Sequence, residues 1–324
     1  MQHKTRRGFA ALALAAAFAP ACHAQAFPTK PITLVVPYAA GGLTDQLARE
    51  VGAYMAGALK QAVVVDNRPG GAAQIAMSLL KQAPADGHTV LFGDVPSLAT
   101  NVGLFAKLSY DPRKDLQAVS QLVVAPALVV VPNDSPFKTF ADLAGAAAAR
   151  PKGLTYASQG VGSGAHLFGT LLSRRLGVTM AHAPYRGSMP GLTDVMGGQV
   201  DFMYDAIPTS GSFVKTGKLR ALAIGAERRA TALPDVPTLQ ELGYGAVVPT
   251  FWWGVAVKAG TPADVVDRLQ HVVHAAMRDP ALARKFTDQG VVIKTSTAAE
   301  FSAYIDSEIT RWTQVMRDAG MTAE

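Results

Sequence analysis

Short apolar runs and helical patterns alternate along the first third of the chain. Ile32–Val36 is a run rich in β-branched residues that stops at Pro37, and the glycine pair at 41–42 leads into a helical pattern over 43–59. The scheme repeats with strands expected at 63–65 and 89–92. Continuous apolar strands separated by helices are typical of parallel sheets that are covered on both faces, so the pattern predicts an α/β fold.

The second half repeats this organisation after a long apolar run. That run spans 122–131 and is broken by Pro126, and a strand of this length can pass from one domain to another. We then expect strands at 154–157, near 180, at 200–204 and at 219–224, with a loop at 158–164 and a helix at 165–176. The apolar run 251–257 predicts a strand that returns to the first domain.

The C-terminal region predicts two amphipathic helices. In each, apolar residues recur at helical spacing, which predicts a stripe that faces the core. One stripe consists of Val265, Val266, Leu269, Val272, Val273 and Ala276, and the other of Phe301, Ile305, Ile309, Trp312 and Met316.

The first 24 residues differ from the rest of the chain. A basic start containing Lys4, Arg6 and Arg7 is followed by an uncharged Ala/Leu run over 9–21 and by small residues before position 25, which predicts an export signal. The run is shorter than the roughly 20 apolar residues that a membrane-spanning helix needs. The paired arginines leave both the general secretory and the twin-arginine route open, and Cys22 leaves lipidation as an alternative.

Charge and cysteine content narrow the class of protein. The 324 residues are 49% hydrophobic and 17% charged, which indicates a folded protein with room for two domains. Loss of residues 1–24 would leave 27 basic against 24 acidic residues and reduce the formal charge from +6 to +3. No extended basic cluster follows, so we expect no nucleic-acid partner. Cys22 is the single cysteine, so the mature chain would have no disulfide and no cysteine-based metal centre.

Motifs for catalysis and metal binding are mostly missing from the sequence. There is no Gly-x-Ser-x-Gly elbow and no phosphate-binding P-loop. His271 and His274 lie one helical turn apart but opposite the apolar stripe, so we expect a solvated pair rather than a metal site. The segment 160–165 matches the Gly-x-Gly-x-x-Ala dinucleotide fingerprint, yet the next strand ends at Arg186 with no acidic residue to bind a ribose.

Two glycine loops, one in each half, lead from a strand into a helix. These loops, 41–42 and 160–164, allow backbone N–H groups to approach a ligand closely, and a helix N-terminus favours an anion. We therefore expect them to hold a carboxylate from opposite sides, although tight turns alone would also account for the glycines. Asp45 lies in the first turn of its helix, where we expect it to have a structural role.

The glycine loops belong to a longer series of motifs. In chain order these are VPYAAGGLTD at 36–45, DNRPG at 66–70, ADGHT at 85–89, YASQGVGS at 156–163 with HL at 166–167, APYRG at 183–187, GGQVD at 197–201 and PT at 237–238. Together they resemble the Bug family, the periplasmic substrate-binding receptors of tripartite tricarboxylate transporters. The resemblance runs from about residue 27 to the C-terminus. The chain departs from the usual pattern at Ala40, at Thr170, and at Ala72 and Ala73, where glycines are frequent in that family.

The resemblance implies a type II periplasmic-binding-protein fold, in which two α/β domains are joined by two crossing strands with a ligand cleft between them. The expected division is a signal peptide at 1–24, a first domain at 27–123 plus 250–324 and a second domain at 124–249. Asp205 is where we expect selectivity to arise, because an inward-facing carboxylate would favour an amino acid or a hydroxyl-bearing acid. Carried over from the family, the ligand-binding residues are Tyr38, Gly41, Gly42, Ser158, Gly160, Gly162, Ser163, His166, Tyr185 and Asp205.

The function implied by the resemblance is that of a periplasmic receptor and not of an enzyme. Such a receptor captures a small mono- or dicarboxylate by hinge closure and passes it to the permease subunits of the transporter, as a monomer and without a cofactor. A sensory partner of a membrane signalling protein, and less favourably an exported enzyme, stay as alternatives. His166 has the alternative role of bonding only to nearby backbone. Trp252 and Trp253 are expected to pack at the return strand, where one of them can line the cleft.

Overall fold

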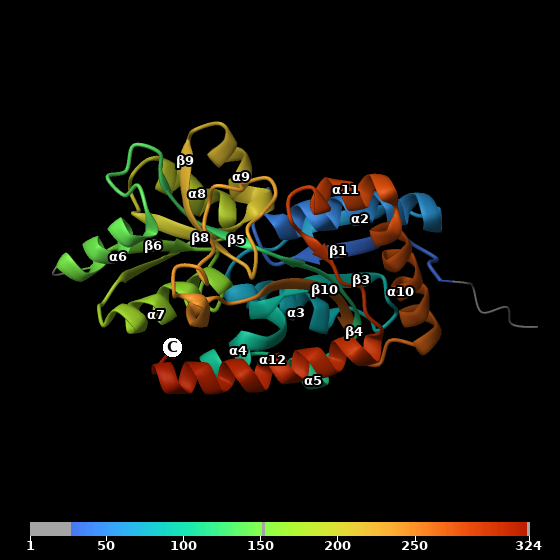
Figure 1. The fold of residues 1–324 in the computed structure, drawn as a ribbon. Helices are drawn as coiled ribbons and strands as arrows, with labels where there is room; N and C mark the ends of the chain where they lie inside the picture. The colour runs from blue at the N-terminus through green and yellow to red at the C-terminus, as the bar shows by residue number, and fades with distance from the viewer. Residues whose placement is uncertain (1–26, 151–152, 323–324) are drawn as a thin grey trace, which may run out of the picture.

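The computed structural model describes residues 27–150 and 153–322, and the predicted signal segment 1–24 lies outside these ranges. Within the described ranges the strands form one sheet of six and one sheet of five. Each sheet is covered by helices, so the molecule has two lobes, with the five-stranded sheet in the lobe to the left of Figure 1.

The first sheet has the strand order β11-β4-β10-β3-β1-β2. β1 pairs in parallel with β2 and β3, whereas β10 runs antiparallel to β3 and β4. Four of the five residues of β1 are buried, as a parallel strand covered on both faces requires. The strands are β1 (Ile32–Val36), β2 (Val63–Asn67), β3 (Thr89–Asp94), β4 (Leu116–Ala125), β10 (Phe251–Lys258) and β11 (Val292–Ile293).

The second sheet has the strand order β7-β6-β8-β5-β9. β6 pairs in parallel with β7 and β8, and β5 runs antiparallel to β8 and β9. The strands are β5 (Ala127–Pro132), β6 (Thr155–Ser158), β7 (Ala181–Pro184), β8 (Phe202–Ala206) and β9 (Leu219–Gly225). Both sheets are mixed, and together with the helices they give the α/β class that the sequence predicts.

The helices connect and cover the strands of both lobes. Those within the first lobe are α2 (Leu43–Leu59), η2 (Gly71–Ala73), α3 (Gln74–Gln82), η3 (Pro96–Thr100), α4 (Asn101–Leu104), α5 (Pro112–Asp115), α10 (Ala263–Arg278), α11 (Pro280–Thr287) and α12 (Ala298–Ala319). Those within the second lobe are α6 (Phe140–Ala149), α7 (Gly164–Leu176), α8 (Ser188–Met196), α9 (Ile207–Lys215) and η4 (Gly245–Val247).

The two predicted apolar stripes are confirmed. All their residues are buried, in α10 and in α12 respectively. α12 begins with a capping box in which Thr297 and Glu300 bond reciprocally to each other's backbone N–H. It runs along the lower edge of Figure 1, and its C-terminal end reaches the second lobe, where the guanidinium of Arg174 donates to the carbonyl of Asp318 at 2.6 Å.

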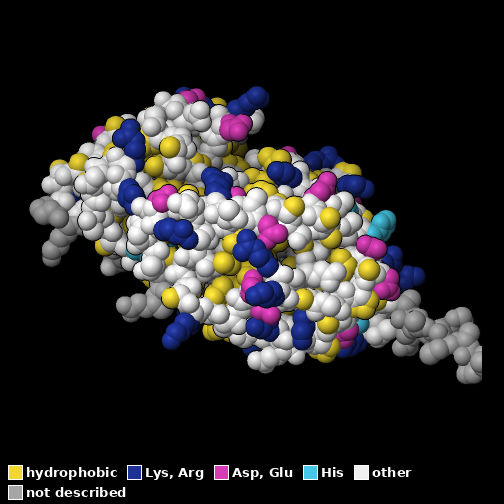
Figure 2. All heavy atoms as spheres, turned by 90° about the horizontal axis from the view of Figure 1, so that it is seen from below, with side chains coloured by type: hydrophobic (Ala, Val, Ile, Leu, Met, Phe, Trp, Pro, Cys, Tyr) yellow, Lys and Arg dark blue, Asp and Glu magenta, His cyan; other side chains and the backbone are white. Residues whose placement is uncertain are grey.

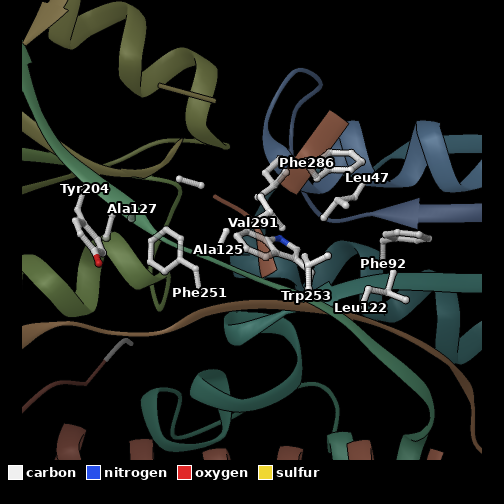
Figure 3. Packing of buried hydrophobic residues seen from close by; sticks show 14 of the residues in the cluster. Leu47, Phe92, Leu122, Ala125, Ala127, Tyr204, Phe251, Trp253, Phe286 and Val291 are labelled. Carbon is white, nitrogen blue, oxygen red and sulfur yellow. The ribbon is translucent and has the colours of Figure 1, made fainter. Parts of the chain in front are cut away.

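The lobes are joined at two crossings, as predicted from the long apolar runs. β4 continues into β5 through Pro126, whose carbonyl accepts a hydrogen bond from the N–H of Ile207 at 3.1 Å, and β10 makes the return. The hydrophobic core continues across this junction. In Figure 3, Phe251 lies between Tyr204 of the second lobe and Trp253 of the first, with ring centroids 5.2 and 6.1 Å away.

The expectation of a solvated histidine pair on α10 is wrong for His274. Its Nε2 lies 2.9 Å from the hydroxyl of Ser120 on β4 and 3.1 Å from the carbonyl of Ser296, so this side chain is half-buried in a hydrogen-bond network. Within residues 27–150 and 153–322 no group of three or more His, Cys, Asp or Glu residues has the arrangement of a metal site.

The face seen in Figure 2 carries charges of both signs, and the described helices include no candidate membrane span. On the face seen in Figure 2, Lys and Arg side chains are interspersed with Asp and Glu. Of the helices in the described part of the chain, none combines the length and the apolar character needed to cross a bilayer.

Candidate ligand-binding site

A small cavity lies between the two lobes. It has a volume of about 40 Å³, enough for roughly three water molecules. The parallel strands β1, β3, β6 and β8 direct their carboxyl ends toward it, which is where open α/β sheets bind ligands. It is lined by Tyr38, Gly42, Leu43, Thr44, Asp94, Val95, Pro96, Gln159, Ser163, Gly164, Ser188, Asp205, Ala206, Phe251, Trp252 and Trp253.

Four helices begin at this cavity. Residues in the first turns of α2, α7 and α8, and the N-cap residue of α9, line its wall. The N-cap residues of α2, α8 and α9 make no side-chain capping bond, and α7 is capped by Ser163, whose hydroxyl accepts from the N–H of His166 at 3.4 Å. α9 offers less to a ligand, because the N–H of Ile207 already donates to the carbonyl of Pro126 and Pro208 has no N–H. The N-termini of α2, α7 and α8 carry unpaired N–H groups and a partial positive charge, so the cavity wall is suited to a carboxylate.

Asp45 has the structural role that the sequence predicts. Its carboxylate accepts from the N–H of Gly41 at 2.9 Å, from Asn67 and from Arg49. Burial alone would raise the pKa of Asp45, but these hydrogen bonds outweigh it and hold the pKa below its ordinary value. The N–H of Gly41 is therefore already engaged, and an added Cβ at Gly41 would meet Met189 of the second lobe at 2.8 Å. Gly42, its neighbour, lies on the cavity wall.

Asp94 is a cavity residue that the sequence analysis missed. It ends β3, is 7% exposed, and accepts from the hydroxyl of Tyr38 at 2.6 Å and from the hydroxyl of Ser97 at 3.0 Å. Burial raises the pKa of Asp94 to about 6, although the two hydrogen bonds oppose the shift. Its position at the carboxyl end of a strand is the one signal in the sequence that could have identified it.

Asp205 lies on the opposite side of the cavity, at the end of β8, and is fully buried. Its Oδ1 accepts from the hydroxyl of Ser188 at 2.6 Å and from Nε2 of Gln159 at 2.8 Å. Burial raises the pKa of Asp205 to about 6, against the effect of these bonds. The Oδ2 atom of Asp205 and the Oε1 atom of Gln159 are buried without a hydrogen-bond partner among the described residues.

A wide groove adjoins the cavity and contains several further predicted residues. Its volume is about 800 Å³, and Tyr38, Pro96, Gln159 and Ser163 line both spaces. Of the residues predicted to bind ligand, the cavity gathers Tyr38, Gly42, Ser163 and Asp205, and the groove gathers Tyr38, Gly160, Ser163, His166 and Tyr185.

Three predicted residues line neither space. Gly41 packs on Met189, Ser158 bonds to the ring of His182, and Gly162 contacts the first lobe. An added Cβ at Gly162 would lie 2.9 Å from the side-chain oxygen of Asn101, and the N–H of Gly162 donates to Nδ1 of His166 at 3.1 Å. His166 therefore makes the hydrogen bond to nearby backbone that was predicted as its alternative role.

His166 stacks on His182 at the groove wall. The ring centroids are 4.0 Å apart and the planes differ by 8°, and Tyr156 stacks on the other side of His182. Burial lowers the pKa of His166 to about 4. Burial, together with the neighbouring His166, lowers the pKa of His182 to about 3. Both rings are therefore neutral near pH 7 and act as hydrogen-bond acceptors or donors without charge.

Direct contacts hold the lobes together around the cavity. The hydroxyl of Thr100 donates to the carbonyl of Gly162 at 2.8 Å, and the N–H of Ala39 donates to the carbonyl of Arg186 at 2.8 Å. Trp253 extends from the return strand and donates from its indole nitrogen to the hydroxyl of Thr44 at 2.8 Å. Trp253 therefore lies on the cleft wall, which is one of the positions predicted for the tryptophans.

Comparison with known proteins identifies the family. The family model described as "Tripartite tricarboxylate transporter family receptor" matches residues 47–321. The chain belongs to this family. The receptor is 32% identical to protein BugT of Bordetella pertussis over 298 residues, which cover 92% of this chain and 91% of that protein. The resemblance to Bug proteins is confirmed.

Solved structures agree with this assignment. The receptor superposes on Rpa4515 of R. palustris, solved with adipate, with a TM-score of 0.87 at 32% identity, covering 92% of this chain and 100% of that one. It superposes on MatC of Rhodopseudomonas palustris, solved with bound malate, with a TM-score of 0.85 at 32% identity, covering 89% and 99% of the chains. The predicted type II fold, with two α/β domains and a cleft between them, is therefore confirmed, and the relatives are solute-binding receptors.

Proposed function

We propose that this receptor binds one small mono- or dicarboxylate in the cavity between its lobes. The observation that carries the proposal is the convergence of the N-termini of α2, α7 and α8, two of them without a side-chain cap, on one space between the lobes. Unpaired N–H groups at such ends are the backbone donors that a carboxylate needs. Related receptors solved with adipate and with malate support the ligand class.

Binding is proposed to involve hinge motion about the two crossings. A cavity of about 40 Å³ has room for a few water molecules, whereas a carboxylate with several heavy atoms needs more space. The lobes must therefore part for the ligand to enter and then close over it. The contact between Thr100 and Gly162 belongs to the closed arrangement in this scheme. The predicted domain boundaries at 123/124 and 249/250 stay a prediction for where the two moving lobes meet.

The proposal is tested most sharply at Gly42. This residue has extended backbone with φ −77°, and an added Cβ would make only ordinary contacts with Ser188 at 3.7 Å. Gly42→Asp would place a carboxylate at the N-cap of α2, where it satisfies the N–H groups offered to the ligand. Gly42→Ala adds the Cβ without the carboxylate and serves as the matched control.

The measurement is a thermal-shift and calorimetric screen of the chain from Gln25 onward against mono-, di- and tricarboxylates. Ligand at a hundredfold excess over Kd adds about 2.7 kcal/mol of stability, which raises the melting temperature by several degrees. We expect Gly42→Asp to abolish this shift without lowering the melting temperature of the free protein, and Gly42→Ala to retain most of it. Binding of carboxylates by Gly42→Asp at wild-type affinity would contradict the proposed site.

Export and delivery complete the proposed function. We propose that residues 1–24 direct the chain to the periplasm by the general secretory or the twin-arginine route and are then removed. N-terminal sequencing of periplasmic protein tests the cleavage position. Delivery to the permease of a tripartite tricarboxylate transporter is supported by the family assignment. It predicts that ligand uptake by cells requires both this receptor and the permease, which a sensory role would not require.

A further inference from the structure

The cavity contains an acidic subsite that a plain carboxylate leaves unused. Asp205 is 0% exposed, and its Oδ1 accepts from the hydroxyl of Ser188 and from the amide of Gln159. Its Oδ2 has no partner among the described residues. A buried carboxylate oxygen without a donor is costly, so the position is suited to a hydrogen-donating group of the ligand.

The side chain of Gln159 adds a second acceptor at the same place. Its Nε2 donates to Oδ1 of Asp205 at 2.8 Å and to the carbonyl of Tyr204 at 3.3 Å. These two acceptors fix the orientation of the amide, because a flip would turn its oxygen against a carboxylate and a carbonyl. Oε1 is consequently the free end, and it is buried without a partner among the described residues. Both Asp205 and Gln159 line the cavity.

The charges around the cavity favour a cationic group over a neutral one. Within the described part of the chain, the lining includes the carboxylates of Asp94 and Asp205 and no Lys, Arg or His side chain. A ligand carboxylate alone would add a third acidic group to this buried space. A hydroxyl group has one hydrogen to donate, whereas an ammonium group has three and carries the compensating charge.

We infer that the receptor selects an amino acid, whose carboxylate lies at the helix N-termini and whose ammonium group donates to Asp205 and Gln159. This inference rests on the proposed function and narrows its ligand class. The carboxylate is held by the first turn of α2 and its neighbours, and the ammonium group fills the acceptor pair on the wall formed by the ends of β6 and β8. Water in the same place is the competing occupant, since it can donate two hydrogen bonds.

Calorimetry with matched ligand series tests the inference. Each series keeps one carbon skeleton and changes the substituent next to the carboxylate: alanine, lactate and propionate; aspartate, malate and succinate; glutamate, hydroxyglutarate and glutarate; phenylalanine, phenyllactate and phenylpropionate. We expect the tightest ligand to be an amino acid that binds at least about tenfold more tightly than its hydroxy and unsubstituted partners. These measurements need only the wild-type mature chain.

Two variants then test whether Asp205 causes the preference for the amino acid. Asp205→Asn keeps the shape and removes the charge, and we expect the advantage of the amino acid over its unsubstituted partner to fall at least tenfold. Asp288→Asn alters an exposed acid at the end of α11 and should leave that advantage unchanged. Equal or tighter binding of the unsubstituted or hydroxy acid by the wild type would overturn the inference while the proposed function stands. Failure of every acid in the panel to bind would overturn both.

Discussion

The hydrogen bond between Thr100 and Gly162 provides a direct test of lobe closure. The hydroxyl of Thr100 is fully buried in the first lobe and donates to the carbonyl of Gly162 in the second at 2.8 Å. Thr100→Val keeps the shape of the side chain and replaces the hydroxyl by a methyl group. In the closed arrangement the carbonyl of Gly162 would then be buried without its donor.

The magnitude follows from the position of this bond. Leaving a buried acceptor without a partner costs about 1–3 kcal/mol. Because the bond joins the two lobes, this cost falls on the closed state that binds ligand and not on the folding of either lobe. The same free energy corresponds to a roughly 5- to 150-fold loss of affinity. We expect the melting temperature of the ligand-free variant to stay close to that of the wild type.

Isothermal titration with the carboxylate that gives the largest thermal shift measures the effect. Thr310→Val is the matched control, because the hydroxyl of Thr310 is exposed and donates only to the carbonyl of Asp306 within α12. The control should bind as the wild type does. An unchanged affinity of Thr100→Val would show that this bond does not contribute to closure, and a lowered melting temperature with unchanged affinity would assign it to folding instead.

Two further predictions concern stability. Glu308→Leu should lower the free energy of unfolding by about 2–5 kcal/mol, because the buried carboxylate accepts from the indole nitrogens of Trp252 and Trp312 at 2.9 and 3.0 Å. Urea unfolding measures this loss of stability, and a loss below about 1 kcal/mol would contradict the prediction. The pKa of His182 is lowered to about 3 from an ordinary value of 6.5, so the folded protein holds this ring neutral. The neutral ring contributes fully to the stability of the fold above pH 6.5, and this contribution is lost as the pH falls below 6.5. His182→Phe, which keeps a ring against His166, should therefore lose less stability than the wild type between pH 7 and pH 5, and equal losses would refute the assignment.

Local patterns in the sequence determine much of the fold, and these parts are predicted correctly. The helical pattern at 43–59 coincides with α2, because its apolar period and the preceding glycine pair are both encoded locally. Pro126 separates β4 from β5 where the long apolar run is broken, since proline lacks the N–H that a ladder needs. The stripes of α10 and α12 are buried as their spacing predicts.

The parts that the sequence does not predict depend on contacts between distant segments. Asp94, Gln159 and Ser188 are polar residues at strand or helix ends, and such residues are common in loops. They become cavity residues because the two lobes bring three separate segments together. His274 likewise lies opposite its apolar stripe, and only the neighbouring β4 and the segment before α12 supply its partners.

In the proposed binding scheme, the loop before α7 takes part in both ligand binding and lobe closure. Gly160 and Gly162 have φ angles of +134° and +80°, a region that side chains with a Cβ rarely adopt. This path turns the N–H of Gly162 toward His166 and its carbonyl toward Thr100, so both polar atoms are engaged before any ligand arrives. A substitution at Gly162 would consequently disturb the contact between the lobes, with its Cβ 2.9 Å from the side chain of Asn101. The two glycines of this loop therefore differ in their surroundings, because Gly160 lines the groove while Gly162 forms a contact between the lobes.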